Sequence, residues 1–107
     1  MNERQLTTAR EMIGDFMPAL AELTDDLLIS DVWERAELSP RDRSLVTIAA
    51  LVAGGNTEQL GSHLERGLLN GLSPDEVKAA ITHLAFYAGW PRAMSAVTVA
   101  RRTLEGR

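Results

Sequence analysis

A histidine within an apolar helical stripe is the residue of this chain best suited to chemistry. His63 shares one helical face with Leu60, Leu64, Gly67 and Leu68. Its imidazole titrates near neutral pH, so it can donate or accept a proton in a reaction. Two interpretations stay open from the spacing alone. His63 is either a buried histidine that hydrogen-bonds between helices or a proton donor at an active site.

The other candidates for chemistry are few. His83 also lies in an apolar helical stretch, where it is either a polar group at a subunit contact or part of a site. Arg43 precedes an apolar helix and either pairs with acidic residues or holds a carboxylate substrate. The two histidines have no H-x-x-x-H or H-E-x-x-H spacing and no third ligand, so no metal site is predicted. The absence of cysteine excludes disulfides and thiolate catalysis.

A predicted helical hairpin positions His63. Ser39 can cap a helix that has Pro40 in its first turn, and Gly54-Gly55 ends this helix. A second helix opens at Asn56 or Thr57 and ends at Asn70-Gly71. Glycines before a helix can also bind an anion, but a tight turn is the preferred interpretation here.

The amino-terminal third is predicted to be helical and acidic. Residues 2–15 have helical spacing, Pro18 interrupts or restarts the helix, and residues 19–29 continue it. Residues 24–26 are an alternative start for a separate short helix. Trp33 is predicted to anchor this arm, residues 1–37, onto the rest of the chain.

Two further helices complete an all-α chain. Ser73 and Glu76 form a capping box that opens a helix from Pro74 to Ala88. Gly89-Trp90-Pro91 is expected to break the chain before a last helix from Arg92 to Leu104. No period-two pattern predicts a strand. The residues of the last helix predicted to face inward are Ala93, Ala96, Val97, Ala100 and Leu104.

Length and charge limit the classes of function. The 107 residues predict a single domain, and the net charge is −4. Residues 1–43 carry ten acids against five arginines, which argues against nucleic acid or an anionic membrane as partner. No signal peptide or spanning stretch is recognised, so a cytoplasmic protein is expected. Residues 44–52 and 79–90 carry no charge, and helices apolar on all sides must be covered, which predicts a homo-oligomer.

The order of these motifs resembles the carboxymuconolactone decarboxylase family over roughly residues 38–104. No single motif is specific, but the ensemble is. The matching residues are Arg43 to Leu51, Leu60-x-x-His63, Asn70-Gly71-Leu72-Ser73-x-x-Glu76-Val77 and His83-x-x-x-Tyr87-x-Gly89-x-Pro91-x-Ala93.

This resemblance implies a compact all-α fold built around a helical hairpin and assembled into trimers or hexamers. The alkylhydroperoxidase branch has the pattern E-x(11)-C-x-x-C-x(3)-H. Aligned on His63, that pattern places Asn56 and Gln59 where the cysteines belong and Ser44 where the glutamate belongs. A thiol peroxidase needs a thiolate, so this activity is excluded.

The decarboxylase branch is the closer match. It implies a lyase of aromatic-compound catabolism that removes carbon dioxide from a small carboxylated lactone without a cofactor. His63 is then the expected proton donor. The expected substrate-binding residues are Gln59, Arg43, Arg66, His83, Tyr87 and Trp90.

Three departures from the decarboxylase pattern leave the substrate open. Glu-Leu-Arg precedes the histidine of that branch, whereas this chain has Gln59-Leu60-Gly61. Trp90 and Arg92 replace small residues. The alternative function is a non-catalytic ligand-binding or structural oligomer on the same scaffold, and metal-dependent hydrolysis is a third, less supported hypothesis.

Overall fold

The computed structural model describes residues 8–106, and within them every regular element is a helix, as predicted. The chain divides into two units, residues 1–40 and residues 41–107. The first part of the helix expected over residues 2–15 lies outside the described residues. No described helix is long and apolar enough to cross a bilayer.

The first unit contains α1 (Ala9–Ile13), α2 (Pro18–Glu22), the π-helix η2 (Leu23–Ile29) and the 3-10 helix η3 (Val32–Glu34). Pro18 restarts the helix, as predicted. The continuation over residues 19–29 widens into a π-helix, in which the Ser30 N–H donates to the Asp25 carbonyl at 3.0 Å. In its first turn, the Thr24 hydroxyl donates to the Leu20 carbonyl at 2.7 Å, a contact that competes with regular helical bonding.

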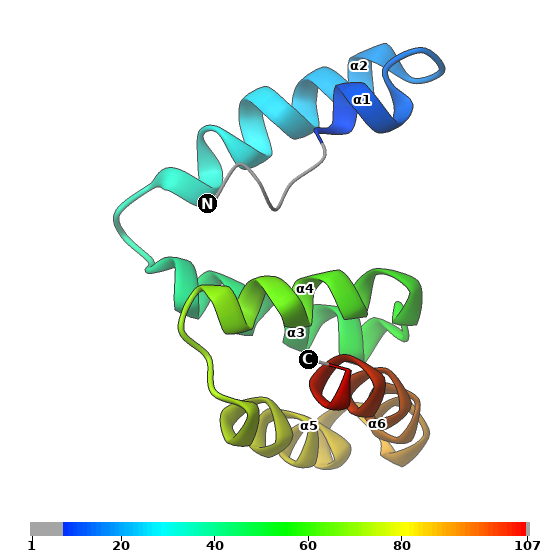
Figure 1. Cartoon of the computed structure of the whole chain (residues 1–107). Coiled ribbons are helices and arrows are strands. Elements are labelled where there is room, and N and C mark those ends of the chain that lie inside the picture. Colours follow the sequence, from blue (N-terminus) through cyan, green and yellow to red (C-terminus); the bar gives the residue numbers. More distant parts are fainter. Residues whose placement is uncertain (1–7, 107) are drawn as a thin grey trace. The chain divides into compact units, whose positions relative to one another are not determined.

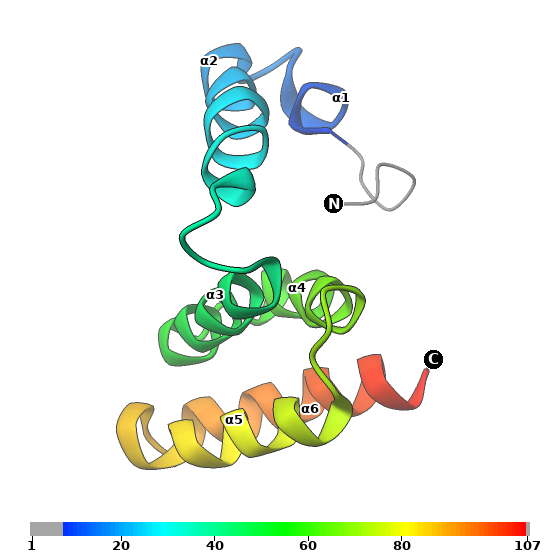
Figure 2. The same cartoon turned by 90° about the vertical axis from the view of Figure 1, so that its left-hand side faces the viewer.

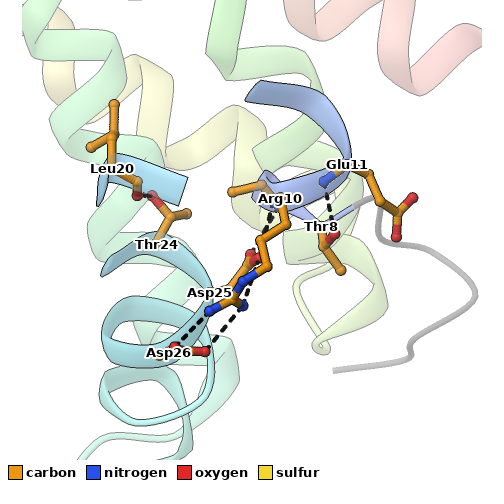
Figure 3. Close-up of polar contacts among 8 residues, drawn as sticks. Thr8, Arg10, Glu11, Leu20, Thr24, Asp25 and Asp26 are labelled. Carbon is orange, nitrogen blue, oxygen red and sulfur yellow. Dashed lines mark hydrogen bonds and ion pairs between the residues drawn. The ribbon is translucent and has the colours of Figure 1, made fainter. Parts of the chain in front are cut away.

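Asp25 holds the start of α1 (Figure 3). Its carboxylate accepts hydrogen bonds from the backbone N–H groups of Ala9 at 2.8 Å and Arg10 at 3.1 Å. The Arg10 guanidinium lies 3.3 Å from the same carboxylate and 2.7 Å from that of Asp26. The alternative that residues 24–26 cap a separate short helix is wrong, because they lie inside η2, whose N-cap is Glu22. Asp25 caps a helix sixteen residues earlier in the chain.

The predicted hairpin forms the first half of the second unit. Helix α3 (Pro40–Gly54) turns through Gly55 into α4 (Thr57–Leu69). Gly55 has φ +70°, a backbone conformation that glycine adopts without strain. The Asn56 N–H donates to the Leu51 carbonyl at 2.9 Å and closes the turn.

Helices α5 (Pro74–Ala88) and α6 (Trp90–Glu105) form the other half. The capping box is present: the Glu76 N–H donates to Ser73 Oγ, and the Ser73 N–H donates to Glu76 Oε1. The expected break over residues 89–91 is too long, because only Gly89, with φ +101°, separates the helices. Trp90 and Pro91 are instead the first residues of α6, since a proline in the first turn sacrifices no helical hydrogen bond.

The α3–α4 pair lies over the α5–α6 pair, and the core fills the space between them (Figures 1 and 2). One residue of α6 that was predicted to face inward does not: Val97 is 37% exposed, and Val99 is buried instead. Val99 follows the buried Ala96 by three residues and therefore shares its helical face. The buried core comprises Ile48, Val52, Leu60, Leu64, Leu72, Val77, Ile81, Ala85, Ala93, Ala96, Val99 and Ala100.

The two glycines of α4 differ in the space available for a side chain. A Cβ on Gly67 would lie 2.9 Å from Leu72 Cδ1 and 3.0 Å from Ile48 Cδ1, whereas one on Gly61 would meet nothing closer than 3.7 Å. Both alanine variants gain helix propensity, of about 1 kcal/mol, but only Gly67→Ala overpacks the core, at a cost of about 1–3 kcal/mol. Chemical denaturation should show Gly61→Ala to be more stable than Gly67→Ala by that cost. Equal stabilities would contradict the close packing at Gly67.

Candidate active site

His63 lies on one flank of α4, beside the residues that face the core. Leu60, Leu64 and Gly67 are buried, and His63 is half-buried at the edge of their face. Its Nδ1 atom is shielded from solvent and has no hydrogen-bond partner among residues 8–106. An unsatisfied buried nitrogen costs stability and often marks a functional position. The hydrogen bond expected of a purely structural histidine is therefore absent at this atom.

The same flank of α4 contacts α3 at its carboxyl end. At 100° per residue, Gln59, Arg66 and Asn70 lie on the His63 side of the helix. Asn70 Nδ2 donates at 3.0 Å to the hydroxyl of Ser44, which is buried in α3. This hydrogen bond joins the carboxyl end of the flank to α3.

Four predicted site residues, Arg43, Gln59, His63 and Arg66, lie on the two helices of the hairpin, and we call this group the α3–α4 seam. Arg43 precedes Ser44 in α3 and is half-buried, with its Nε atom shielded from solvent. Arg66 follows His63 by one turn of α4, and the exposed Gln59 precedes it by one turn. The seam therefore carries two guanidinium groups, an amide and an imidazole.

The seam disfavours positive charge on His63. Burial lowers the pKa of His63 below its ordinary value of 6.5, and the positive charge of Arg66 lowers it further. Burial also lowers the pKa of Arg66, although a guanidinium remains charged at any physiological pH. In the free chain, burial and the charge of Arg66 therefore both favour the uncharged imidazole of His63.

The remaining predicted site residues lie at the junction of α5 and α6. His83 and Tyr87 have ring centroids 4.9 Å apart, and Phe86 meets Trp90 at 5.1 Å in an edge-to-face arrangement. Tyr87 and Trp90 are 79% and 57% exposed. In the described part of the chain, no hydrogen bond or ring contact joins this junction to His63. Substrate binding by His83, Tyr87 and Trp90 stays a prediction.

Two grooves accompany these helices, and His63 lines neither of them. A groove of about 440 Å³ lies between α5 and α6. A wider one of about 720 Å³ lies between α4 and α6, on the flank of α4 opposite to His63. Residues 8–106 contain no cluster of three or more side chains of the histidine, cysteine, aspartate and glutamate types that would hold a metal. The α4–α6 groove is lined by Thr57, Glu58, Gly61, Glu65, Ser95, Thr98, Val99, Arg102, Thr103 and Gly106.

The sequence analysis missed the hydrogen bond that aligns the seam. Ser44 and Asn70 were both recognised as parts of the family motifs, Ser44 also as the position of a glutamate in the peroxidase branch and Asn70 also as a helix stop, but no hydrogen bond between them was predicted. A signal was present, because Ser44 shares the helical spacing of Ile48 and Val52 and must therefore be buried with them. A buried hydroxyl requires a partner, and Asn70 supplies it.

The lowered pKa of His63 predicts how stability depends on pH. The unfolded chain binds a proton at His63 near pH 6.5, while the folded chain does so only at a lower pH. Acidification from pH 7.5 through that window should therefore lower the unfolding free energy. His63→Gln should lose this part of the dependence, as measured by urea denaturation of both proteins across the window. Identical pH dependence of the two proteins would contradict the lowered pKa.

Comparison with known proteins agrees with this architecture. The family model described as the carboxymuconolactone decarboxylase family matches residues 18–102. A 4-carboxymuconolactone decarboxylase of Acinetobacter baylyi is 32% identical over 105 residues, which are 98% of this chain and 78% of that protein. The nitrosuccinic acid decarboxylase npaB of Metarhizium robertsii is 30% identical over 83 residues, which are 78% of this chain and 58% of that protein.

The family match includes all of the seam and most of the helices of both units. It extends from Pro18, at the start of α2, almost to the end of α6. The relatives are decarboxylases that differ in the substrate they are named for. On this evidence the chain belongs to the carboxymuconolactone decarboxylase family and shares its all-α fold.

Proposed function

We propose that this protein is a cofactor-independent carboxy-lyase that acts on a small carboxylated lactone or a related acid. The observation that carries the proposal is the half-buried imidazole of His63 one helical turn from Arg66, in a chain whose relatives are decarboxylases. Both relatives are named for acids, 4-carboxymuconolactone and nitrosuccinic acid. A small acid is accordingly the substrate class that we assign to this chain.

The guanidinium groups of the seam are suited to bind that acid. A partly desolvated arginine binds a carboxylate more strongly than an exposed one does, and with paired hydrogen bonds. Arg66 is partly desolvated and lies beside His63, and Arg43 lies on the facing helix. In our proposal these arginines seat the substrate carboxylate, and the Gln59 amide contributes a polar contact.

The reaction requires one proton. When carbon dioxide leaves, the electron pair of the broken bond stays on the substrate carbon, and this carbon must then be protonated. The arginines stabilise the electron-rich intermediate electrostatically, and His63 supplies the proton. The products are therefore carbon dioxide and the acid with hydrogen in place of the lost carboxylate.

Substrate binding resolves the apparent conflict with the lowered pKa of His63. A carboxylate beside Arg66 offsets the positive charge that lowers this pKa and adds a negative charge near the imidazole. His63 then takes up a proton from solvent as the substrate binds, and later transfers it to carbon. In this proposal the substrate that loses its carboxylate also promotes the protonation of His63.

The alternative function is ligand binding without catalysis. It is favoured by two features: burial and the charge of Arg66 lower the pKa of His63, and His63 lines neither groove. A binding module would retain the affinity of the seam for carboxylates but would release them unchanged. Turnover distinguishes the two functions directly.

The first experiment measures decarboxylation by ultraviolet absorbance with 4-carboxymuconolactone and with nitrosuccinic acid as separate probes. His63→Ala should lower kcat by about 10²- to 10⁴-fold, the usual contribution of a general acid. His83→Leu is the comparison variant, because it also removes a histidine but lies outside the seam; it should leave the subunit fold intact and lower kcat by less than His63→Ala does. Binding of either acid without turnover by the wild type would favour the alternative function. Loss of activity in His83→Leu with the fold intact would move the site to the α5–α6 junction.

A second experiment tests the coupling of His63 to charge without any turnover. The pKa of His63 is followed by NMR of its imidazole protons in the free protein. Arg66→Gln should raise this pKa only part of the way to 6.5, because burial is the larger cause of the shift and remains. Adding succinate, an unreactive dicarboxylate, should raise the pKa in the wild type and less in the variant. An unchanged or lower pKa in Arg66→Gln would contradict the proposed coupling.

A further inference from the structure

The groove between α5 and α6 has no role in the proposed reaction. The two helices lie side by side along it (Figure 2), and its volume of about 440 Å³ is within the usual range of ligand pockets. Ile81 of α5 and Ala100 of α6 line it and are almost fully buried, so they form an apolar floor. Val97 and Leu104 extend this apolar lining along α6. The groove can therefore remove an apolar ligand body from water.

Two cationic side chains line the walls of this groove, Lys78 from α5 and Arg101 from α6. Glu105 accompanies them, with its carboxylate 3.8 Å from Arg101 Nε, but the two side chains of this pair are 72% and 73% exposed. Such an exposed ion pair is weak, so the guanidinium remains able to bind a ligand. The Thr82 hydroxyl also lines the groove but already donates to the Lys78 carbonyl at 2.9 Å. The two cations are therefore the groups that would select a ligand.

The opposite flank of α6 provides an internal comparison. Val97 and Arg101 lie on the flank that lines the α5–α6 groove. Their neighbours Thr98 and Arg102, each about 100° further around the helix, line the α4–α6 groove instead. That second groove carries two glutamates and a single arginine, which is the reverse of the charge balance between α5 and α6. An anion is therefore favoured in the α5–α6 groove, although the whole chain has a net charge of −4.

We propose that the α5–α6 groove is a binding site for an organic monocarboxylate with an apolar body. The body lies on the floor at Ile81 and Val97, and the carboxylate is bound by Lys78 and Arg101. A guanidinium can donate two parallel hydrogen bonds to a carboxylate, and an ammonium group adds a compact positive charge. The site is separate from the α3–α4 seam, so this inference does not depend on the proposed decarboxylation.

Lys78 makes binding in the groove directly observable, because it is the only lysine of the chain. Reductive methylation with isotope-labelled formaldehyde gives its amine an NMR signal and keeps its positive charge. The signal is identified by its loss in Lys78→Gln. Octanoate should shift it in a saturable manner, whereas octylammonium, which has the same apolar chain and the opposite charge, should not. A signal that octanoate leaves unchanged, or that both ligands shift alike, would overturn the proposal.

Two pairs of neighbouring residues on α6 supply matched variants for this titration. Arg101→Gln should raise the Kd for octanoate about two- to fivefold, the usual effect of removing an exposed ion pair, while Arg102→Gln should leave it unchanged. Val97→Glu places a carboxylate beside that of the ligand and should weaken binding, whereas Thr98→Glu adds the same charge on the other flank of the helix and should weaken it less. Far-ultraviolet circular dichroism checks that all four variants keep the helical content of the wild type. Equal effects within either pair would overturn the proposal.

Two further comparisons separate this groove from the seam. Succinate has carboxylates but no long apolar body, so it should act on the Lys78 signal at least about tenfold more weakly than octanoate does. Arg66→Gln alters the seam and should leave the octanoate titration of Lys78 unchanged. Equal affinity for succinate, or weaker octanoate binding in Arg66→Gln, would overturn the proposal. Hydrocinnamate carries the same carboxylate on an aromatic body, and tighter binding of one of the two acids would identify the body that the groove prefers.

Discussion

The close approach of α3 and α4 at Gly67 is the constraint on which the rest of the second unit depends. Without a side chain at this position, the ends of Ile48 and Leu72 fill the space beside the α4 backbone. The same approach brings Asn70 within hydrogen-bonding distance of the buried Ser44 hydroxyl. One apolar contact and one polar contact thus align the two helices, and this alignment determines what surrounds His63.

The seam brings together two groups, His63 and Arg66, that repel each other when both are positively charged. A half-buried imidazole and a partly desolvated guanidinium one turn apart on α4 both lose hydration, and their positive charges repel. The free protein relieves part of this cost by leaving His63 uncharged. In the proposed function, an anion bound at the seam offsets more of it, and this is why we expect the seam to bind acids more strongly than an exposed pair of the same residues would.

Helix boundaries were predictable wherever a side chain or a proline marks them. The capping box of Ser73 and the stop at Asn70-Gly71 are local signals, and the structure confirms both. The cap that Asp25 provides for α1 was not predictable, because it joins residues that are sixteen positions apart. The same limit applies to the site. Periodicity placed His63 within an apolar stripe, and the structure places it half-buried at the edge of that stripe. The direction of its pKa shift depends on this burial and on the nearby charge of Arg66, neither of which periodicity shows.

The cap at Asp25 makes the order of α1 conditional on that of η2. A helix of five residues does not persist alone in water, because nucleation costs more than so few hydrogen bonds return. The N–H groups at its start find their acceptor only when the π-helical turn holds the Asp25 carboxylate in place. The amino-terminal segment therefore opens and closes as one cooperative unit, and its amide hydrogens should exchange with solvent together and not helix by helix.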